Sequence, residues 1–192
     1  MTERPPQTLA PGRALAGGPT FSLRNRLYRL AWLIAWTLLV RPTPRPLWAW
    51  RRAILRLFGA TLTSTSRIYG SARIWSPANL RMGHNSSIGP RVRVYNMAPI
   101  TIGDGAIVSQ DAHLCAGTHD YQDPYFPLVA RPITIAARAW IAAEAFIAPG
   151  VTIGEGAVLG ARAVATRDIP PWTVAIGSPA QVVKQRVMRT AA

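Results

Sequence analysis

From Ile68 onward the chain is built from a six-residue repeat, which limits the possible folds more than any other feature of the sequence. Each hexad begins with an aliphatic residue and has a small residue four places later, as in Ile68/Ala72. The thirteen hexads begin at Ile68, Ile74, Met82, Ile88, Val94, Ile102, Val108, Leu114, Ile135, Ile141, Ile147, Ile153 and Leu159. A period of six matches neither one face of an α-helix nor a simple alternating strand. It indicates a solenoid with short straight faces and tight corners.

Three hexads make one triangular coil, so thirteen hexads predict a little over four coils. The aliphatic residue is expected to point inward and stack on its copy in the next coil, and the small residue is expected to lie near a corner. A glycine directly after the aliphatic residue, as in Ile102-Gly103 and Ile153-Gly154, is expected to accommodate the bend. The sequence therefore predicts an all-β solenoid over residues 61–186, with residues 187–192 as a frayed tail.

The repeat stops at His119 and resumes at Ile135, which predicts a loop inserted over residues 120–134. A corner accepts a loop without disturbing the stack of coils. The loop carries aromatic rings and acids, which suit stacking on sugar rings and hydrogen bonding to hydroxyls; an ordinary packed loop remains an alternative. His119, the last hexad residue, is expected to face outward, and imidazole is the side chain best suited to take a proton near neutral pH.

The segment 21–60 is expected to form two helices interrupted at Pro42, Pro44 and Pro46. Its uncharged apolar stretch, 30–40, is about half the length that a membrane span needs. On the second helix, Trp50, Ile54, Leu57 and Phe58 are expected to share the apolar face. Arginine and tryptophan on short apolar helices suit an interfacial membrane contact. They equally suit a cap that buries the last coil of the solenoid, and both interpretations stay open.

Charge is concentrated before the repeat. The chain has a net charge of +14, and residues 1–67 hold eleven arginines against one acid, Glu3. This excess indicates an anionic partner, although an arginine-rich composition alone is the alternative. We expect no nucleic-acid partner, because no reader motif is present. Residues 1–20 lack an apolar signal region and are expected to form a flexible arm, and the single cysteine fits a cytoplasmic protein, with or without peripheral contact at the inner membrane face.

Four stretches carry a resemblance to a known family: "RPTPRPLWAWRRAILRLFGA", "NMAPITIGDGAIVSQDAHLCAGTHDY", "PGVTIGEGAVLGARAV" and "AIGSPAQVVK". The chain resembles the hexapeptide-repeat acyltransferases over residues 21–186, in particular proteins assigned as colanic acid biosynthesis acetyltransferases and the related maltose and galactoside acetyltransferases. The resemblance implies a left-handed parallel β-helix with an N-terminal helical extension, a homotrimer, and acetyl-CoA as acyl donor without a metal.

The resemblance also implies roles for individual residues. His119 matches the histidine that acts as general base before the loop. Acceptor binding falls on Asn96, Asp120, Tyr121, Asp123 and Tyr125. The matching donor positions are Trp140, Ala142, Ala143, Gly160, Ala161, Thr166, Arg167 and Lys184. Arg167 replaces the usual lysine, and Gln181 stands where relatives often carry a base, which removes one expected phosphate contact.

We therefore predict an acetyl-CoA-dependent O-acetyltransferase that acts directly on a sugar hydroxyl, free or in a lipid-linked glycan, in exopolysaccharide or glycoconjugate assembly. One alternative is a non-catalytic, membrane-associated trimeric scaffold. Another is a γ-type carbonic anhydrase, a class of enzyme that is built on the same kind of β-helix and binds zinc through three histidines. The chain has three, His84, His113 and His119, but their spacing of twenty-nine and six residues differs from that family's pattern.

Overall fold

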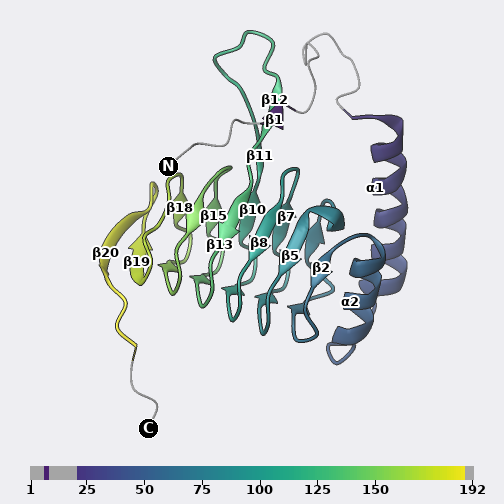
Figure 1. Ribbon diagram of the computed structural model, residues 1–192, viewed down its shortest axis with the longest axis horizontal. Helices are drawn as coiled ribbons and strands as arrows, with labels where there is room; N and C mark the ends of the chain where they lie inside the picture. The colour runs from purple at the N-terminus through teal and green to yellow at the C-terminus, as the bar shows by residue number, and fades with distance from the viewer. Residues whose placement is uncertain (1–6, 9–20, 189–192) are drawn as a thin grey trace.

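The computed structural model describes residues 7–8 and 21–188. These residues form a left-handed parallel β-helix with two helices packed on its N-terminal end and a hairpin that projects from one edge (Figure 1). The fold class and the N-terminal helical extension predicted from the sequence are therefore confirmed. Apart from residues 7–8, the predicted arm 1–20 lies outside the described residues, as does most of the tail.

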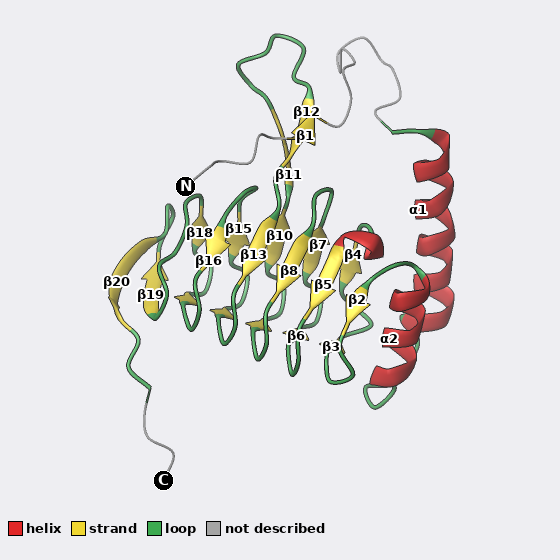
Figure 2. Cartoon of the chain, in the orientation of Figure 1, coloured by secondary structure: helices red, strands yellow, loops and turns green. Residues whose placement is uncertain are grey.

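Three flat faces, named here in the order in which the chain visits them, form the prism (Figure 2). The first face consists of β2 (Thr61–Leu62), β5 (Leu80–Met82), β8 (Ile100–Ile102), β13 (Ile133–Ile135) and β16 (Thr152–Ile153). The second consists of β3 (Arg67–Ile68), β6 (Ser87–Ile88), β9 (Ile107–Val108), β14 (Trp140–Ile141), β17 (Val158–Leu159), β19 (Thr173–Ile176) and the antiparallel β20 (Gln181–Gln185). The third consists of β4 (Arg73–Ile74), β7 (Arg93–Tyr95), β10 (His113–Cys115), β15 (Phe146–Ile147) and β18 (Val164–Ala165).

The β-helix has more strands than the thirteen hexads of the sequence predicted. The first and third faces carry five strands each, and β19 adds a sixth parallel strand to the second face. The extra first strand is β2, whose inward Leu62 and buried Ser66 form a hexad that its four neighbouring threonines and serines conceal in the sequence. At the C-terminal end, one hexad is shortened by two residues, and this brings Ile169 beside Ile153. The shortened spacing conceals the last turn of the β-helix in the sequence.

The core is the predicted column of aliphatic residues. All thirteen aliphatic residues that begin the hexads are buried, and small residues such as Ala106 and Ala145 are buried beside them at the corners. The expected role of glycine after the aliphatic residue is wrong, because the left-handed residue of the corner comes two places later, at Gly105 (φ 66°). Gly103 is needed for space instead: a Cβ there would lie 2.6 Å from the backbone nitrogen of Ala137 in the next coil.

The N-terminal helices are α1 (Leu23–Ala35), continued by the π-helical turn η2 (Trp36–Val40), and α2 (Trp48–Leu57). They cover the open end of the solenoid and provide hydrogen-bond donors for its unpaired backbone carbonyls. Between coils, five carbonyls of the second coil, for example those of Met82 and Ile88, accept hydrogen bonds from the first coil. The equivalent carbonyls of the first coil have no preceding coil to bond.

Side chains of the two helices bond all five of these first-coil carbonyls. The indole N–H groups of Trp32 and Trp36 donate to Ile74 O (2.7 Å) and Ala72 O (3.0 Å). Three guanidinium groups of α2 bond the other three carbonyls: Arg51 to Ile68 O, Arg52 to Ser66 O and Arg56 to Leu62 O. The capping interpretation is therefore confirmed for these residues.

The predicted apolar face of α2 is wrong in part. Ile54 and Phe58 pack inward, but Leu57 is 79% exposed and Trp50 is 45% exposed. The inward position is taken by Arg51, which is 2% exposed and also donates to the carbonyl oxygens of Thr43 and Pro44. An unpaired row of carbonyls requires donors, so an arginine occupies a position where a helical wheel predicts a leucine. Burial lowers the pKa of Arg51.

The first and third faces meet at an irregular edge, where two segments that lengthen the six-residue repeat by two residues each stack on each other. One contains the 3-10 turn η3 (Pro77–Asn79), and the other is the segment 96–99 one coil later. Asn79 donates to the carbonyls of Asn96 and Met97. The hairpin leaves the solenoid at this edge in the following coil. Among the described residues, none of the helices is both long and apolar enough to span a bilayer.

Candidate active site

The inserted segment is a β-hairpin rather than an irregular loop. Its arms are β11 (Gly117–His119) and β12 (Leu128–Ala130), paired antiparallel with His119 opposite Leu128. A third strand, β1 (Gln7–Thr8), pairs with β12, so these two residues of the predicted arm are part of a sheet. The departure from the solenoid therefore lies near Gly117, three residues before the predicted boundary, and the first face resumes at β13.

His119 lies on the exposed arm of this hairpin, and its imidazole is oriented by the backbone. Its Nδ1 atom lies 2.7 Å from the carbonyl oxygen of Phe126. A carbonyl oxygen only accepts, so in the neutral imidazole Nδ1 carries the proton and Nε2 presents a lone pair. Phe126 has φ 47°, a costly conformation for a bulky residue, which the hairpin maintains. The geometry supplies a positioned base.

The carbonyl of Phe126 was not anticipated as the orienting group. Asp120, the residue next to His119, does not orient the imidazole, because the Asp120 carboxylate accepts from the backbone N–H of Gln122 (3.0 Å). Asp123 caps the next turn in the same way, accepting from the N–H of Tyr125 (2.8 Å). No sequence signal identifies a backbone carbonyl seven residues away, because its position follows from the hairpin register.

The predicted acceptor residues divide into two groups. Tyr121 and Tyr125 lie on the hairpin tip, 80% and 43% exposed, on the same loop as His119. Asn96 does not lie on an open surface. It is fully buried, accepts from the N–H of Ser76 (3.0 Å) and donates to the Ser76 carbonyl oxygen (2.5 Å). The acceptor role predicted for Asn96 is therefore wrong for this structure, since its amide holds two stacked corners together.

The predicted donor residues follow the C-terminal coils. Trp140 projects from the second face, 45% exposed, with its indole N–H bonded to Ser109 Oγ (2.9 Å). Ala142, Ala143, Gly160 and Ala161 lie at the edge between the second and third faces. Thr166 and Arg167 are exposed at the edge where the hairpin departs, one face away, and Lys184 is exposed on β20 beside the second face.

The predicted donor residues at this edge also differ in whether their backbone N–H groups are already hydrogen-bonded. The N–H of Ala142 is used by Leu159 O (2.9 Å). The N–H of Ala143 donates to no acceptor within the part of the chain that the structure describes, so it remains available to a ligand. Gly160 has a packing reason to be glycine, because a Cβ there would lie 2.6 Å from the Ile176 side chain.

In one copy of the chain, His119 and Ala143 belong to different edges of the prism. The third face lies between them, because the hairpin leaves at its far end and Ala143 precedes its strand β15. The structure thus brings His119 together with the aromatic hairpin tip, and separately gathers most of the donor positions on the second face and its adjoining edge.

Cys115, His84 and His113 are the other side chains that could act as a nucleophile, a base or a metal ligand, and their surroundings differ from those of His119. The Cys115 thiol donates to Gly117 O, and burial raises the pKa of the thiol, so it is a poor nucleophile near neutral pH. His84 lies at a corner, and His113 lies on the third face beside Phe146. Across residues 7–8 and 21–188, no group of three or more metal-binding side chains converges.

Comparison with known proteins links this fold to a family. The chain is 38% identical over 157 residues to WcaF of Escherichia coli K12, assigned as a colanic acid biosynthesis acetyltransferase, covering 82% of this chain and 83% of that protein. An assigned acetyltransferase of Schizosaccharomyces pombe is 42% identical over 93 residues, 47% of this chain and 45% of that protein. No family model matches the sequence.

Solved structures give the same relationship. A maltose O-acetyltransferase from Clostridium difficile 630 superposes with a TM-score of 0.76 at 26% identity, covering 87% of this chain and 90% of that one. The hexapeptide-repeat acetyltransferase VCA0836 of Vibrio cholerae, in complex with acetyl-CoA, gives 0.77 at 26% identity, covering 88% and 93%. The identity to WcaF over most of both proteins, together with the shared solenoid, shows that this chain belongs to the hexapeptide-repeat acetyltransferases.

Proposed function

We propose that the protein transfers an acetyl group from acetyl-CoA directly to a sugar hydroxyl during exopolysaccharide or glycoconjugate assembly. The observation that carries this proposal is the exposed His119 imidazole, whose Nδ1 is bound to Phe126 O while Nε2 is free to accept a proton. A relative assigned to colanic acid biosynthesis and neighbours that acetylate maltose or galactosides support a sugar acceptor. The neighbours solved with acetyl-CoA or CoA support the donor.

His119 acts as general base in this mechanism. Its Nε2 takes the proton of the acceptor hydroxyl as the oxygen attacks the thioester carbonyl carbon, which an un-ionised alcohol attacks poorly. The tetrahedral oxyanion then collapses, the carbon–sulfur bond breaks, and the imidazolium returns its proton to the departing thiolate. The N–H of Ala143, contributed by a neighbouring copy of the chain, donates to the oxyanion in this proposal. Tyr121 and Tyr125 offer stacking surfaces for the sugar.

Trp140 and the small residues Ala161 and Gly160 give the pantetheine arm a flat path along the C-terminal coils, and Arg167 and Lys184 are free to meet the CoA phosphates. Trp140 is exposed although it is a large ring, which supports a ligand-facing role. The alternative of a non-catalytic scaffold gives no reason for an exposed imidazole whose Nδ1 is held by a backbone carbonyl.

The separation of His119 from the second face supports a homotrimer. Three-sided prisms pack around a three-fold axis, which sets the hairpin edge of one copy against a face of the next. A groove between two copies then holds both halves of the site, one from each edge. The site is incomplete in a single chain, so the oligomer is part of the mechanism and not only of the stability.

A peripheral membrane contact through α1 is the further part of this proposal. The side of α1 and η2 opposite Trp32 and Trp36 presents an apolar stripe at helical spacing whose residues are 51–66% exposed: Leu23, Leu27, Leu30, Ile34 and Leu38. Arg24 and Arg26 flank the stripe. An apolar stripe between cations is the pattern of a helix lying on an anionic membrane, and it places the enzyme where lipid-linked glycans are assembled.

The reaction is tested by measuring free-thiol release from acetyl-CoA against a panel of sugars, nucleotide sugars and lipid-linked glycans. Release that depends on one acceptor class, and that His119→Ala reduces by at least two orders of magnitude, is the expected result. Acceptor-dependent release that survives in His119→Ala would remove His119 as base. Absence of both release and CoA binding would favour the scaffold.

A further inference from the structure

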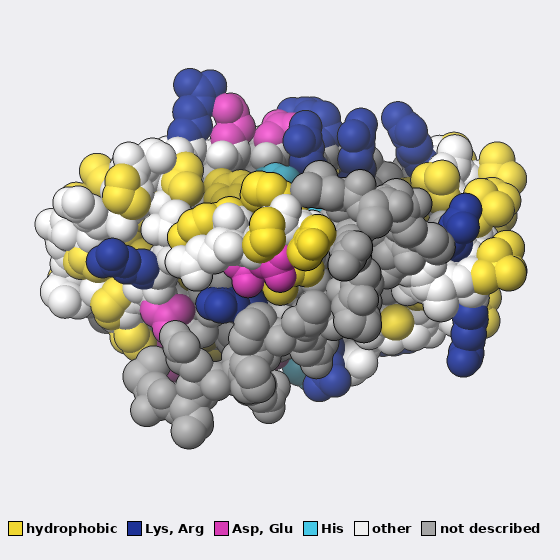
Figure 3. Space-filling model, turned by 90° about the horizontal axis from the view of Figure 1, so that it is seen from above, with side chains coloured by type: hydrophobic (Ala, Val, Ile, Leu, Met, Phe, Trp, Pro, Cys, Tyr) yellow, Lys and Arg dark blue, Asp and Glu magenta, His cyan; other side chains and the backbone are white. Residues whose placement is uncertain are grey.

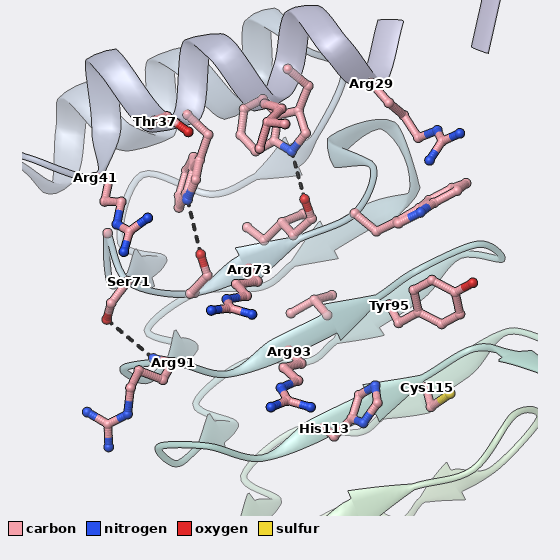
Figure 4. Close-up of a pocket in the computed structure, with 18 of the residues that line it drawn as sticks. Arg29, Thr37, Arg41, Ser71, Arg73, Arg91, Arg93, Tyr95, His113 and Cys115 are labelled. Atoms are coloured by element: carbon pink, nitrogen blue, oxygen red, sulfur yellow. Dashed lines mark hydrogen bonds between the residues drawn. The ribbon is translucent and has the colours of Figure 1, made fainter. Parts of the chain in front are cut away.

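A deep groove lies between α1 and the outer surface of the third face, at the N-terminal end of the solenoid (Figure 4). Its volume is about 1230 Å³, enough for a ligand of several rings. The floor is formed by the outward side chains of β4, β7 and β10, and the roof by α1 and η2. None of the donor or acceptor residues discussed above lines this groove.

The floor carries a column of cationic and imidazole side chains in register. Arg73 is paired with Arg93, and Arg93 with His113, on three successive strands. Neighbouring strands are about 4.8 Å apart, so two guanidinium groups stand one strand apart on the same surface. Like charges directly opposite each other destabilise a sheet. Figure 4 shows Arg41, from the end of η2, pointing toward the same space from the roof.

The groove contains little negative charge of its own. Six arginines line it, with Asp111 as the one acid among the lining residues. Asp111 is already occupied by Arg91, which forms two hydrogen bonds with its carboxylate (2.8 and 2.6 Å). Within the described structure Arg41, Arg73 and Arg93 form no salt bridge, although Arg93 lies close enough to Asp111 to help lower the pKa of that carboxyl after the hydrogen bond from Arg91. A cluster of this kind offers several donors to a compact anion bearing more than one charge.

The rest of the groove is apolar. Leu30 and Leu33, 53% and 60% exposed, line the roof, and the Trp75 and Tyr95 rings contact each other edge to face (5.9 Å) on the floor. The groove ends at Tyr95 and Cys115. His119 follows Cys115 by four residues, so its Cα atom lies at most about 14 Å from that of Cys115. A group held on the arginines would therefore direct its attached sugar toward the hairpin.

We propose that this groove binds the diphosphate of a diphosphate-linked sugar acceptor, with Arg73, Arg93 and Arg41 contacting the phosphates. The inference rests on the proposed function, and it names the anionic handle by which the acceptor is recognised. Two sources share this chemistry, a prenyl diphosphate and a nucleoside diphosphate. The leucines of the roof, continuous with the exposed stripe of α1, favour the prenyl source.

The test is calorimetric titration of the full chain with inorganic pyrophosphate at low salt, in excess CoA so that the donor site is filled. We expect Arg93→Gln and Arg73→Gln each to weaken binding by at least tenfold. Arg81→Gln is the matched control, because Arg81 is an exposed arginine at an equivalent strand position on the first face, outside the groove. It should bind within twofold of the wild type.

Absence of pyrophosphate binding to the wild type, or equal affinity in Arg93→Gln and Arg81→Gln, would overturn the proposal. Titrations with farnesyl diphosphate and UDP separate the two sources, since the one whose organic part contacts the groove binds more tightly than pyrophosphate. Binding requires no turnover, so the groove can be confirmed even if the acetyl acceptor is misidentified. Acetyl transfer to sugars without pyrophosphate binding would refute the groove and leave the enzyme intact.

Discussion

The N-terminal helices and the hairpin are both additions to one regular solenoid, but their polar side chains face in opposite directions. On α1 and α2, tryptophan and arginine donors point into the open end of the prism and bond its first five carbonyls. On the hairpin, His119, Tyr121 and Tyr125 are exposed, and the turns of the loop are held by the backbone, by the two aspartates and by the contact of His119 with Phe126 O. We infer that the first region stabilises the fold and that the second performs chemistry.

The two regions also differ in how they use positive charge. Arg51, Arg52 and Arg56 of α2 are directed to carbonyls. By contrast, among the described residues no hydrogen-bond partner faces the side chains of Arg73 and Arg93 on the third face or of Arg24 and Arg26 on α1. Figure 3 shows the molecule from above, with hydrophobic side chains interspersed with Lys and Arg at the end of the prism where α1 lies. The high charge of the N-terminal third therefore has two explanations, one structural and one concerning ligands or lipid.

The largest expected effect is on the cap. Replacing Arg51 by Met removes donors to the carbonyls of Ile68, Thr43 and Pro44, and it leaves the Ile68 carbonyl buried without a partner. We expect the free energy of unfolding to fall by about 3 kcal/mol, measured by denaturant titration. Arg51→Lys, which keeps a charge and three donors, should recover part of the loss. Equal stability of Arg51→Met and the wild type would contradict the assignment of the cap.

A smaller loss is expected for Trp36→Phe, which keeps most of the ring packing but removes the N–H that bonds Ala72 O. The expected cost is about 1–3 kcal/mol, measured as above. Trp48→Phe is the control, since the Trp48 indole N–H has no acceptor among the described residues. If both variants lose the same stability, packing rather than the hydrogen bond accounts for the cap.

The outward stripe of α1 should matter for membrane binding and not for folding. Leu27→Gln combined with Leu38→Gln should reduce sedimentation with phosphatidylglycerol vesicles by about tenfold, because two buried leucine contacts are lost. Leu57→Gln changes a leucine that is more exposed (79%) but lies outside the stripe, and this variant should bind as the wild type does. Vesicle binding that is unchanged in the double variant would exclude α1 as the contact.

The smallest effect concerns the hairpin tip. Tyr121→Ala should raise the KM for the sugar acceptor about threefold and leave the melting temperature unchanged, since a stacked ring contributes about 0.5–1.5 kcal/mol and this one is largely exposed. Steady-state kinetics at saturating acetyl-CoA measure the change. A drop in melting temperature without a change in KM would make Tyr121 a packing residue.

Most of the solenoid was predictable because its constraint is local and repeated. Each aliphatic residue of a hexad meets its own copy in the next coil, so a pattern read along the chain is also the pattern of packing. Leu62 was missed because the hexad around it is polar, and Arg51 was misplaced because a helical wheel contains no information about an unpaired carbonyl edge. The positions of Leu62 and Arg51 both depend on the absence of a coil before the first one, and no local sequence pattern reports that absence.

The candidate site was only partly predictable for a related reason. His119 and the hairpin aromatics follow from where the repeat breaks. The group that orients His119 is a backbone carbonyl, which carries no residue signature, and the burial of Asn96 depends on how two insertions stack. The separation of His119 from Ala143 by a whole face also becomes visible only once the coils are closed into a prism.

The most direct test of this account is the turnover of His119→Asn, measured together with CoA affinity and melting temperature. Asparagine can still donate to Phe126 O from a position close to Nδ1, but it has no Nε2 to accept a proton. The account predicts a loss of acetyl transfer by a factor of about 10²–10⁴ with CoA affinity and melting temperature unchanged. Turnover within a few-fold of the wild type would show that the hairpin histidine is not the base.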